Sequence, residues 1–315
     1  MADRLNHYIY SETQNPDLAT LDKEVTILEY PAQKTHVEFV KKFNIKEGEK
    51  TAVEKQICDD MLKATEEVLR EIRLGNVGKY ITLRSEDIHI LKREEFDRID
   101  ALEEEEDGKE ITPSDGFARF GSVYMPHLEE SSEFDFAMTL SHEVAHTISR
   151  LSFSFKHEQG KLEIIPKAVG MRRDMPEGED KFDGLNEAVN ELLATKIREK
   201  YIQRAKKTSY LPKDLVELRA YPEAIWVLEE VLQRTAGDKK YNVLNQLFRD
   251  HITGVDTVLK VLAEKKPKIY DALRDMGTKP EDALEVAKKL EYEDVITEIE
   301  MRIHTRLKTN NKKIV

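Results

Sequence analysis

The segment that decides the fold is Glu133-Phe-Asp-Phe-Ala-Met-Thr-Leu-Ser-His142-Glu143-Val-Ala-His146-Thr-Ile-Ser-Arg-Leu151. A Ser-x-x-Asp pair begins at position 132 and can form a capping box at a helix start. We therefore expect a helix from about 133 to 151. Its apolar stripe comprises Phe136, Leu140, Val144, Ile148 and Leu151, and on a 100° wheel the two histidines fall on the opposite side.

The pentapeptide His-Glu-Val-Ala-His at 142–146 has the spacing of a metal site. Residues four apart on a helix lie on one face, so the imidazoles of His142 and His146 can converge on one Zn²⁺. Glu143 points about 100° away from the first histidine, where it can reach a metal-bound water rather than the metal. The alternative is two histidines of an ordinary helix, at least one of them exposed or hydrogen-bonded.

A later segment, Gly184-Leu-Asn-Glu-Ala-Val-Asn-Glu-Leu-Leu-Ala194, predicts a second helix over about 184–203. Its Glu187 and Glu191 are one turn apart, and a catalytic zinc usually takes three protein ligands and a water. The alternative for Glu187 is a first-turn glutamate interacting with the helix dipole.

These two motifs resemble those of the gluzincin metallopeptidases, the thermolysin-like group, which pair His-Glu-x-x-His with a later Asn-Glu-x-x-x-Asp helix. Here that helix carries Asn186-Glu187-Ala-Val-Asn-Glu191, with Glu in place of the final Asp. The resemblance implies one Zn²⁺ per chain, held by His142, His146 and Glu187. It implies that Glu191 accepts the free ring N–H of a ligand histidine, with Asn186 as a second supporting residue.

The resemblance covers about residues 116–203 and implies zinc-dependent peptide-bond hydrolysis, most simply by an endopeptidase in which Glu143 activates a zinc-bound water. The segment 116–125 alternates like a strand and would be the edge strand of the cleft. Gly121, Ser122 and Val123 would then bind an extended peptide by backbone pairing. An ordinary edge strand is the alternative.

An oxyanion donor besides zinc is also expected. We favour Tyr221, because Tyr221-Pro222 begins a helix after the ligand helix, although a structural tyrosine would look the same. The other candidates are Tyr210, Tyr201, His157 and His251.

The sequence departs from related patterns in two respects. The connection from His146 to Glu187 is about twice as long as in thermolysin, so it must hold a hairpin and a loop, expected over 153–170 and 171–183. The metzincin pattern fails, because positions 149 and 152, which would be Gly and His, are Ser149 and Ser152.

The whole chain predicts an α+β fold: a zincin-like mixed sheet with the active-site helix, followed by a mainly α-helical C-terminal subdomain. We expect domains at 1–203 and 204–315, with N-terminal strands within 1–48. The remaining expected elements are strands at Glu24–Tyr30, Lys34–Val40, Lys79–Leu83 and Ile88–Leu91, a helix at 49–74, and helices after Pro212.

Composition narrows the possible functions. The 62 acidic against 50 basic residues give a net charge of −12, which argues against a nucleic-acid partner. The single cysteine, Cys58, excludes an internal disulfide and zinc sites built on several cysteines. There is no apolar run of about 20 residues and no signal-peptide pattern. We expect a soluble cytoplasmic protein acting on peptides or proteins and not bound to membrane, with leaderless export as a toxin or effector left open.

Two hypotheses that assign the protein to other functional classes stay open. One is a catalytically inactive zincin-fold protein that acts as a binding or interaction module. The other is an all-α adaptor with a chance motif, which the strands expected before residue 130 disfavour.

Overall fold

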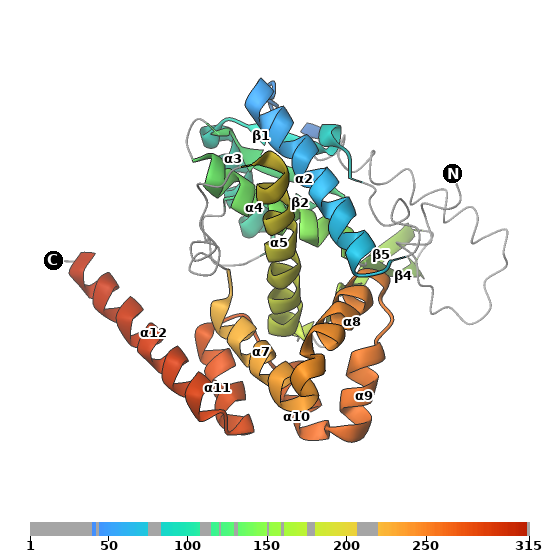
Figure 1. Cartoon of the computed structure of the whole chain (residues 1–315). Coiled ribbons are helices and arrows are strands. Elements are labelled where there is room, and N and C mark those ends of the chain that lie inside the picture. Colours follow the sequence, from blue (N-terminus) through green and yellow to red (C-terminus); the bar gives the residue numbers. More distant parts are fainter. Residues whose placement is uncertain are drawn as a thin grey trace. The chain divides into compact units, whose positions relative to one another are not determined.

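The computed structural model describes residues 40–41, 44–74, 83–107, 115–119, 121–128, 132–149, 151–158, 161–174, 180–206 and 220–313. Helices predominate over these residues, and strands form one three-stranded and one four-stranded sheet, so the chain is of the expected α+β class (Figure 1). Contacts group the described residues into two compact units. One lies within Met1–Ile148 and Ala194–Leu215, the other within Ser149–Leu193 and Val216–Val315.

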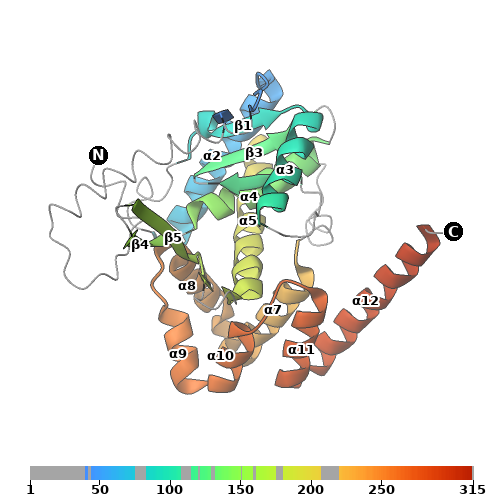
Figure 2. The same ribbon diagram turned by 180° about the vertical axis from the view of Figure 1, so that it is seen from behind.

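The first unit contains a mixed sheet. Strands β1 (Ile88–Leu91), β2 (Phe117–Arg119) and β3 (Ser122–Pro126) have the order β1-β3-β2, with β1 parallel and β2 antiparallel to β3. Helix α3 (Arg93–Asp107) contacts β3, and α4 (Glu133–Ile148) contacts both β2 and β3 (Figure 2). Helix α2 (Ala52–Glu71), expected over 49–74, packs on α4, and a short 3₁₀ helix, η3 (Ser85–Asp87), precedes β1.

The prediction of a single edge strand over 116–125 was wrong. Gly121 lies in a turn at φ 81°, a conformation that favours glycine, and the turn divides the segment into the antiparallel strands β2 and β3. β3 is the central strand, and Val123 pairs with Ile88 on one side and Ala118 on the other. Among the described strands Val123 is therefore paired on both sides, and the peptide-binding role of Gly121, Ser122 and Val123 stays a prediction. Among the described strands of this sheet, β2 and β1 are at the edges.

A buried carboxylate ties the end of β3 to the start of α2. Thr51 and Glu54 form a capping box, and Glu54 Oε2 accepts the Thr51 N–H at 2.7 Å. Its Oε1 lies 3.0 Å from His127 Nδ1 and accepts the Leu128 N–H at 2.8 Å. Burial raises the pKa of Glu54, but the hydrogen bonds from Leu128, Thr51 and His127 outweigh burial and hold it below its ordinary value.

Helix α5 (Asp183–Ala205) confirms the helix expected over 184–203. From Ala194 onward it belongs to the first unit, where Arg198 Nη1 contacts Met138 Sδ on α4 at 2.8 Å. Two ion pairs join it to α2, Lys200 with Glu71 at 2.5 Å and Arg204 with Glu67. The first turns of the same continuous helix belong to the second unit.

The second unit contains an antiparallel sheet of β4 (Leu151–Glu158), β5 (Lys161–Val169), β6 (Arg172–Asp174) and β7 (Asp180–Lys181), in that order. The expected hairpin is thus present as β4 and β5. The loop expected over 171–183 was wrong in part, because β6 and β7 pair across it.

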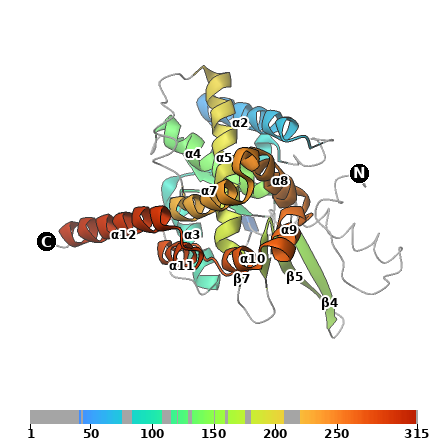
Figure 3. The same ribbon diagram turned by 60° about the horizontal axis from the view of Figure 1, so that its bottom comes forward.

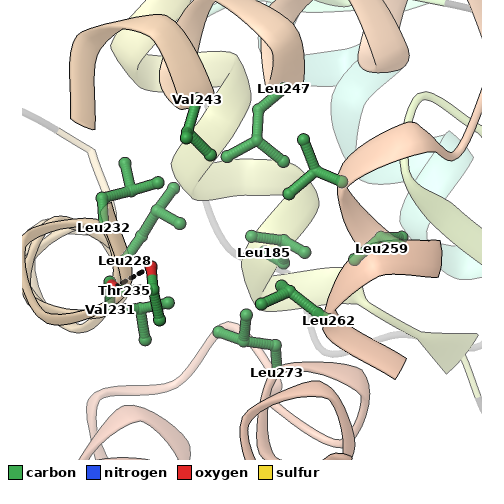
Figure 4. A pocket seen from close by; sticks show the side chains of 11 residues that line it. Leu185, Leu228, Val231, Leu232, Thr235, Val243, Leu247, Leu259, Leu262 and Leu273 are labelled. Carbon is green, nitrogen blue, oxygen red and sulfur yellow. Dashed lines mark hydrogen bonds between the residues drawn. The ribbon is translucent and has the colours of Figure 1, made fainter. Parts of the chain in front are cut away.

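The helices of the second unit are α7 (Pro222–Ala236), α8 (Lys240–Thr253), α9 (Thr257–Lys265), α10 (Pro267–Arg274), α11 (Pro280–Leu290) and α12 (Glu293–Lys313), with a 3₁₀ turn, η5 (Gly237–Lys239), after α7 (Figure 3). This confirms the helical C-terminal region over its described part. Apolar side chains of this unit meet around a pocket (Figure 4), whose lining is Leu185, Leu228, Val231, Leu232, Thr235, Val243, Leu247, Val258, Leu259, Leu262 and Leu273.

Several predictions are not tested by these elements. The strand expected at Glu24–Tyr30 lies outside the described residues, as does Lys34–Val40 apart from Val40, which is helical. Of Lys79–Leu83 only Leu83 is described, and it is not in a strand. β1 confirms the strand at Ile88–Leu91. The domain boundary between 203 and 204 stays a prediction.

Candidate metal centre

Helix α4 forms as its sequence predicts and orients the two histidines. Ser132 Oγ accepts the Asp135 N–H at 3.0 Å at its start, and the helix ends at Ile148, three residues earlier than expected. The members of the apolar stripe within the helix are at most 2% exposed, which leaves the opposite face for His142 and His146, both only partly buried. That stripe is Phe136, Leu140, Val144 and Ile148.

The two imidazoles already have the spacing of a shared ion. His142 Nε2 and His146 Nε2 are 3.1 Å apart, with the ring planes at 79°. Two nitrogens bound to one tetrahedral zinc at 2.0–2.1 Å lie about 3.3 Å apart. The same distance also fits an N–H···N hydrogen bond between the two rings.

Glu187, in the second turn of α5, belongs with this pair. One ligand atom each from His142, His146 and Glu187 lie within 4.8 Å of one another. Two imidazole nitrogens and one carboxylate oxygen are a donor set that zinc takes in catalytic sites, although imidazole also suits other transition metals. The residues present therefore fit a bound divalent transition metal.

Asn186 holds the carboxylate of Glu187 from the side. Its Nδ2 donates to Glu187 Oε1 at 3.1 Å, while its Oδ1 accepts the Met171 N–H at 2.9 Å and the Arg172 N–H at 3.4 Å. The side chain of Asn186 is 2% exposed. It thus connects Glu187 to the turn between β5 and β6, a support that the sequence motif alone did not specify.

Glu143 is only 7% exposed and lies under the start of β2. A Cβ placed on Gly116 would be 3.3 Å from Glu143 Cγ and 2.7 Å from both Thr139 Cγ2 and Met125 Sδ. A larger residue there would force the Thr139 and Met125 side chains to shift, so glycine suits this close passage of the backbone past α4. Sequence reasoning missed this role of Gly116, and the glycine directly before a strand was the one available signal.

The remaining candidate residues differ in how well their positions fit the roles expected of them. Glu191 is buried one turn after Glu187, as expected, and Tyr221 is the N-cap of α7 in the left-handed region at φ 51°. Their chemical roles stay predictions. Tyr201 lies 14 residues beyond Glu187 on the same helix, about 21 Å along its axis, which is too far for its phenol to reach the Glu187 region.

His251 does not have the exposure that an oxyanion donor would need. It is fully buried, and its Nε2 is 2.6 Å from Ser149 Oγ. Only the backbone of His157 is described, in β4, and Tyr210 lies outside the described residues.

A buried arginine was also missed. Arg198, on α5, is 3% exposed and donates to Ala194 O at 3.3 Å and Thr195 Oγ1 at 3.2 Å, besides contacting Met138. It follows Glu187 by 11 residues, three helical turns, so both lie on one face of α5. No short sequence motif predicts a buried arginine, because burial is set by the tertiary structure.

No protein-family model, curated protein sequence or solved structure matches this chain. Among the described residues, none of the helices combines the length and apolar character that crossing a bilayer requires.

Proposed function

We propose that this protein is a zinc-dependent peptide-bond hydrolase, an endopeptidase of gluzincin type. The observation that carries the proposal is the grouping of His142, His146 and Glu187 within 4.8 Å, with the two imidazole nitrogens 3.1 Å apart. This ligand set coincides with the one that the sequence motifs imply.

His142, His146 and Glu187 would hold the metal, which when bound would act as a Lewis acid and lower the pKa of water. Glu143 takes a proton from the attacking water and later delivers it to the leaving nitrogen. The backbone at Gly116 passes close to the Glu143 side chain and leaves no room there for a larger residue without a shift of its neighbours. Asn186 steadies Glu187 through the amide contact, and Glu191 and Tyr221 are assigned here as ring support and oxyanion donor.

A zincin-like arrangement is supported by the way α4 packs on the mixed sheet. The helix contacts β2 and β3, and β2, which begins directly after Gly116, is an edge strand among the described residues. An extended peptide that pairs with β2 would gain backbone hydrogen bonds, as in other strand additions. We therefore assign substrate pairing to Phe117–Arg119.

The decisive experiment compares wild-type protein with Glu143→Gln. Both are analysed for bound zinc and used to digest a peptide library, and Glu199→Gln, a change at an exposed position of α5, is the matched control. We expect all three to bind zinc and only Glu143→Gln to lose cleavage, by on the order of a hundredfold or more.

Two results would count against the proposal. Cleavage by Glu143→Gln at the wild-type rate would rule out its role as general base. Zinc binding without cleavage of any peptide by the wild-type protein would favour the alternative of a non-catalytic zincin-fold binding protein.

A further inference from the structure

A buried polar chain in the second unit leads away from Glu187. It runs from Glu187 to Asn186, then to the turn at Gly170 and Met171, and on to His251 in the last turn of α8. Its last member is Ser149, whose hydroxyl shares a hydrogen bond with His251 Nε2 at 2.6 Å.

The Gly170 turn is where the chain of contacts is tightest. Gly170 has φ +55°, and a Cβ there would lie 2.4 Å from His251 Cε1 and 2.5 Å from Asn186 Oδ1. The imidazole and the amide therefore both press against a backbone position that only glycine can fill. Both side chains therefore pack against the backbone of this turn.

The turn is also fixed from the loop that follows α8. Arg173 Nη1 donates to Gly170 O at 3.0 Å, and its Nη2 pairs with Asp256 at 2.5 Å. His251 thus packs against this turn, and Asp256 reaches it through Arg173. The position of the Asn186 amide depends on it, because Asn186 Oδ1 accepts the Met171 N–H.

We propose that His251 is a positioning residue for Glu187, acting through the Gly170 turn and Asn186. The inference rests on the proposed metal site. Residues that orient a metal ligand by hydrogen bonding typically change metal affinity by on the order of 10- to 100-fold when removed. His251 touches neither substrate nor metal in this role, so its effect is on how firmly the Glu187 carboxylate is held.

The test measures zinc affinity by chelator competition, the absorption spectrum of the Co²⁺-loaded protein, and hydrogen exchange at the Met171 and Arg172 amides. His251→Leu removes the contact with Ser149, and His251→Gln can retain it. Asn186→Asp keeps oxygen acceptors for the two amides but removes the donor to Glu187, whereas Asn186→Ala removes both. Phe248→Leu, one turn before His251 and equally buried, is the control for a general loss of stability.

We expect His251→Leu to weaken zinc binding on the order of 10-fold or more, to shift the Co²⁺ spectrum and to speed exchange at Met171. His251→Gln and Phe248→Leu should stay within about threefold of wild-type affinity. Asn186→Ala should lose both amide protection and affinity. Asn186→Asp should keep the protection and lose affinity.

A His251→Leu protein that melts at a lower temperature but binds zinc as tightly as wild type would overturn the inference, since His251 would then be merely structural. If His251→Leu does not fold, Asn186→Asp decides the hydrogen-bond link, and wild-type affinity in that variant would overturn it. A wild-type protein that binds neither zinc nor cobalt would instead refute the proposed function. The two failures are therefore distinct.

Discussion

His142 Nε2 and His146 Nε2 lie 3.1 Å apart on one turn of α4, close to the separation of about 3.3 Å that a shared tetrahedral zinc imposes. Helix α4 alone therefore places the two histidines at the separation that a shared metal ion would need. The proposed third ligand, Glu187, comes from α5, and its placement depends on more distant parts of the chain.

The first prediction concerns metal content. Wild-type protein should carry about one zinc per chain, and His146→Ala should lose it, because two remaining protein ligands hold zinc weakly. His304→Ala, which changes an exposed histidine of α12, should keep it. Plasma-source metal analysis of the three purified proteins gives the answer, and equal zinc in the wild-type and His146→Ala proteins would exclude this site.

The second prediction concerns Gly116. Gly116→Ala adds a methyl group within 2.7 Å of Met125 and Thr139 and beside Glu143, so we expect a loss of about 1–3 kcal/mol in the free energy of unfolding. We also expect a lower kcat, because the Glu143 carboxylate is displaced. Urea unfolding and steady-state kinetics on a cleaved peptide measure the two effects.

Gly237→Ala is the comparison for Gly116→Ala. Its added methyl meets no atom within 4 Å, although its φ of +52° makes the change strained. It should lower stability without changing kcat. If Gly116→Ala left kcat unchanged as well, the close approach to Glu143 would have no catalytic meaning.

The third prediction concerns pH. The pKa of Glu54 is lowered in the folded protein, so the folded state binds its proton less readily than the unfolded state does. The contribution of ionised Glu54 to the free energy of unfolding is therefore complete above the pKa of Glu54 in the unfolded chain. It is lost as the pH falls through the lower pKa of Glu54 in the folded protein. Glu54→Gln should unfold more easily at pH 7 and show a smaller loss of stability than wild type on going to acid pH. Urea titrations of both proteins across that range test this, and parallel pH profiles would contradict it.

The fourth prediction concerns Cys58. Burial raises the pKa of its thiol to about 12, and the side chain is fully buried on α2. Because the thiolate is the reactive form, the native protein should not react with a thiol reagent at pH 8, whereas the protein in denaturant should react with one equivalent. Rapid stoichiometric labelling of the native protein would show that the thiol is accessible.

The sequence predicted the parts of the site that lie within single helices. The His142–His146 face and the Glu187–Glu191 face follow from the 3.6-residue period alone, since neighbours four apart are fixed by helix geometry. The apolar stripe of α4 was predicted for the same reason. The sequence did not predict where the strands begin and end. The turn at Gly121 can be recognised only once β2 and β3 are seen to be paired.

What the sequence determined by itself is therefore the spacing of the two motifs proposed to bind a metal and the helices that carry them, because their geometry is local. The tertiary structure decided that the backbone at Gly116 packs beside Glu143 and that β3 is the central strand of its sheet. It also decided that His251 and Asn186 pack against the Gly170 turn. Gly116 and Glu143 are 27 positions apart (143 − 116), Gly170 and Asn186 are 16 apart (186 − 170), and Gly170 and His251 are 81 apart (251 − 170). Contacts of that range depend on the folding of the intervening chain, and no short pattern encodes them.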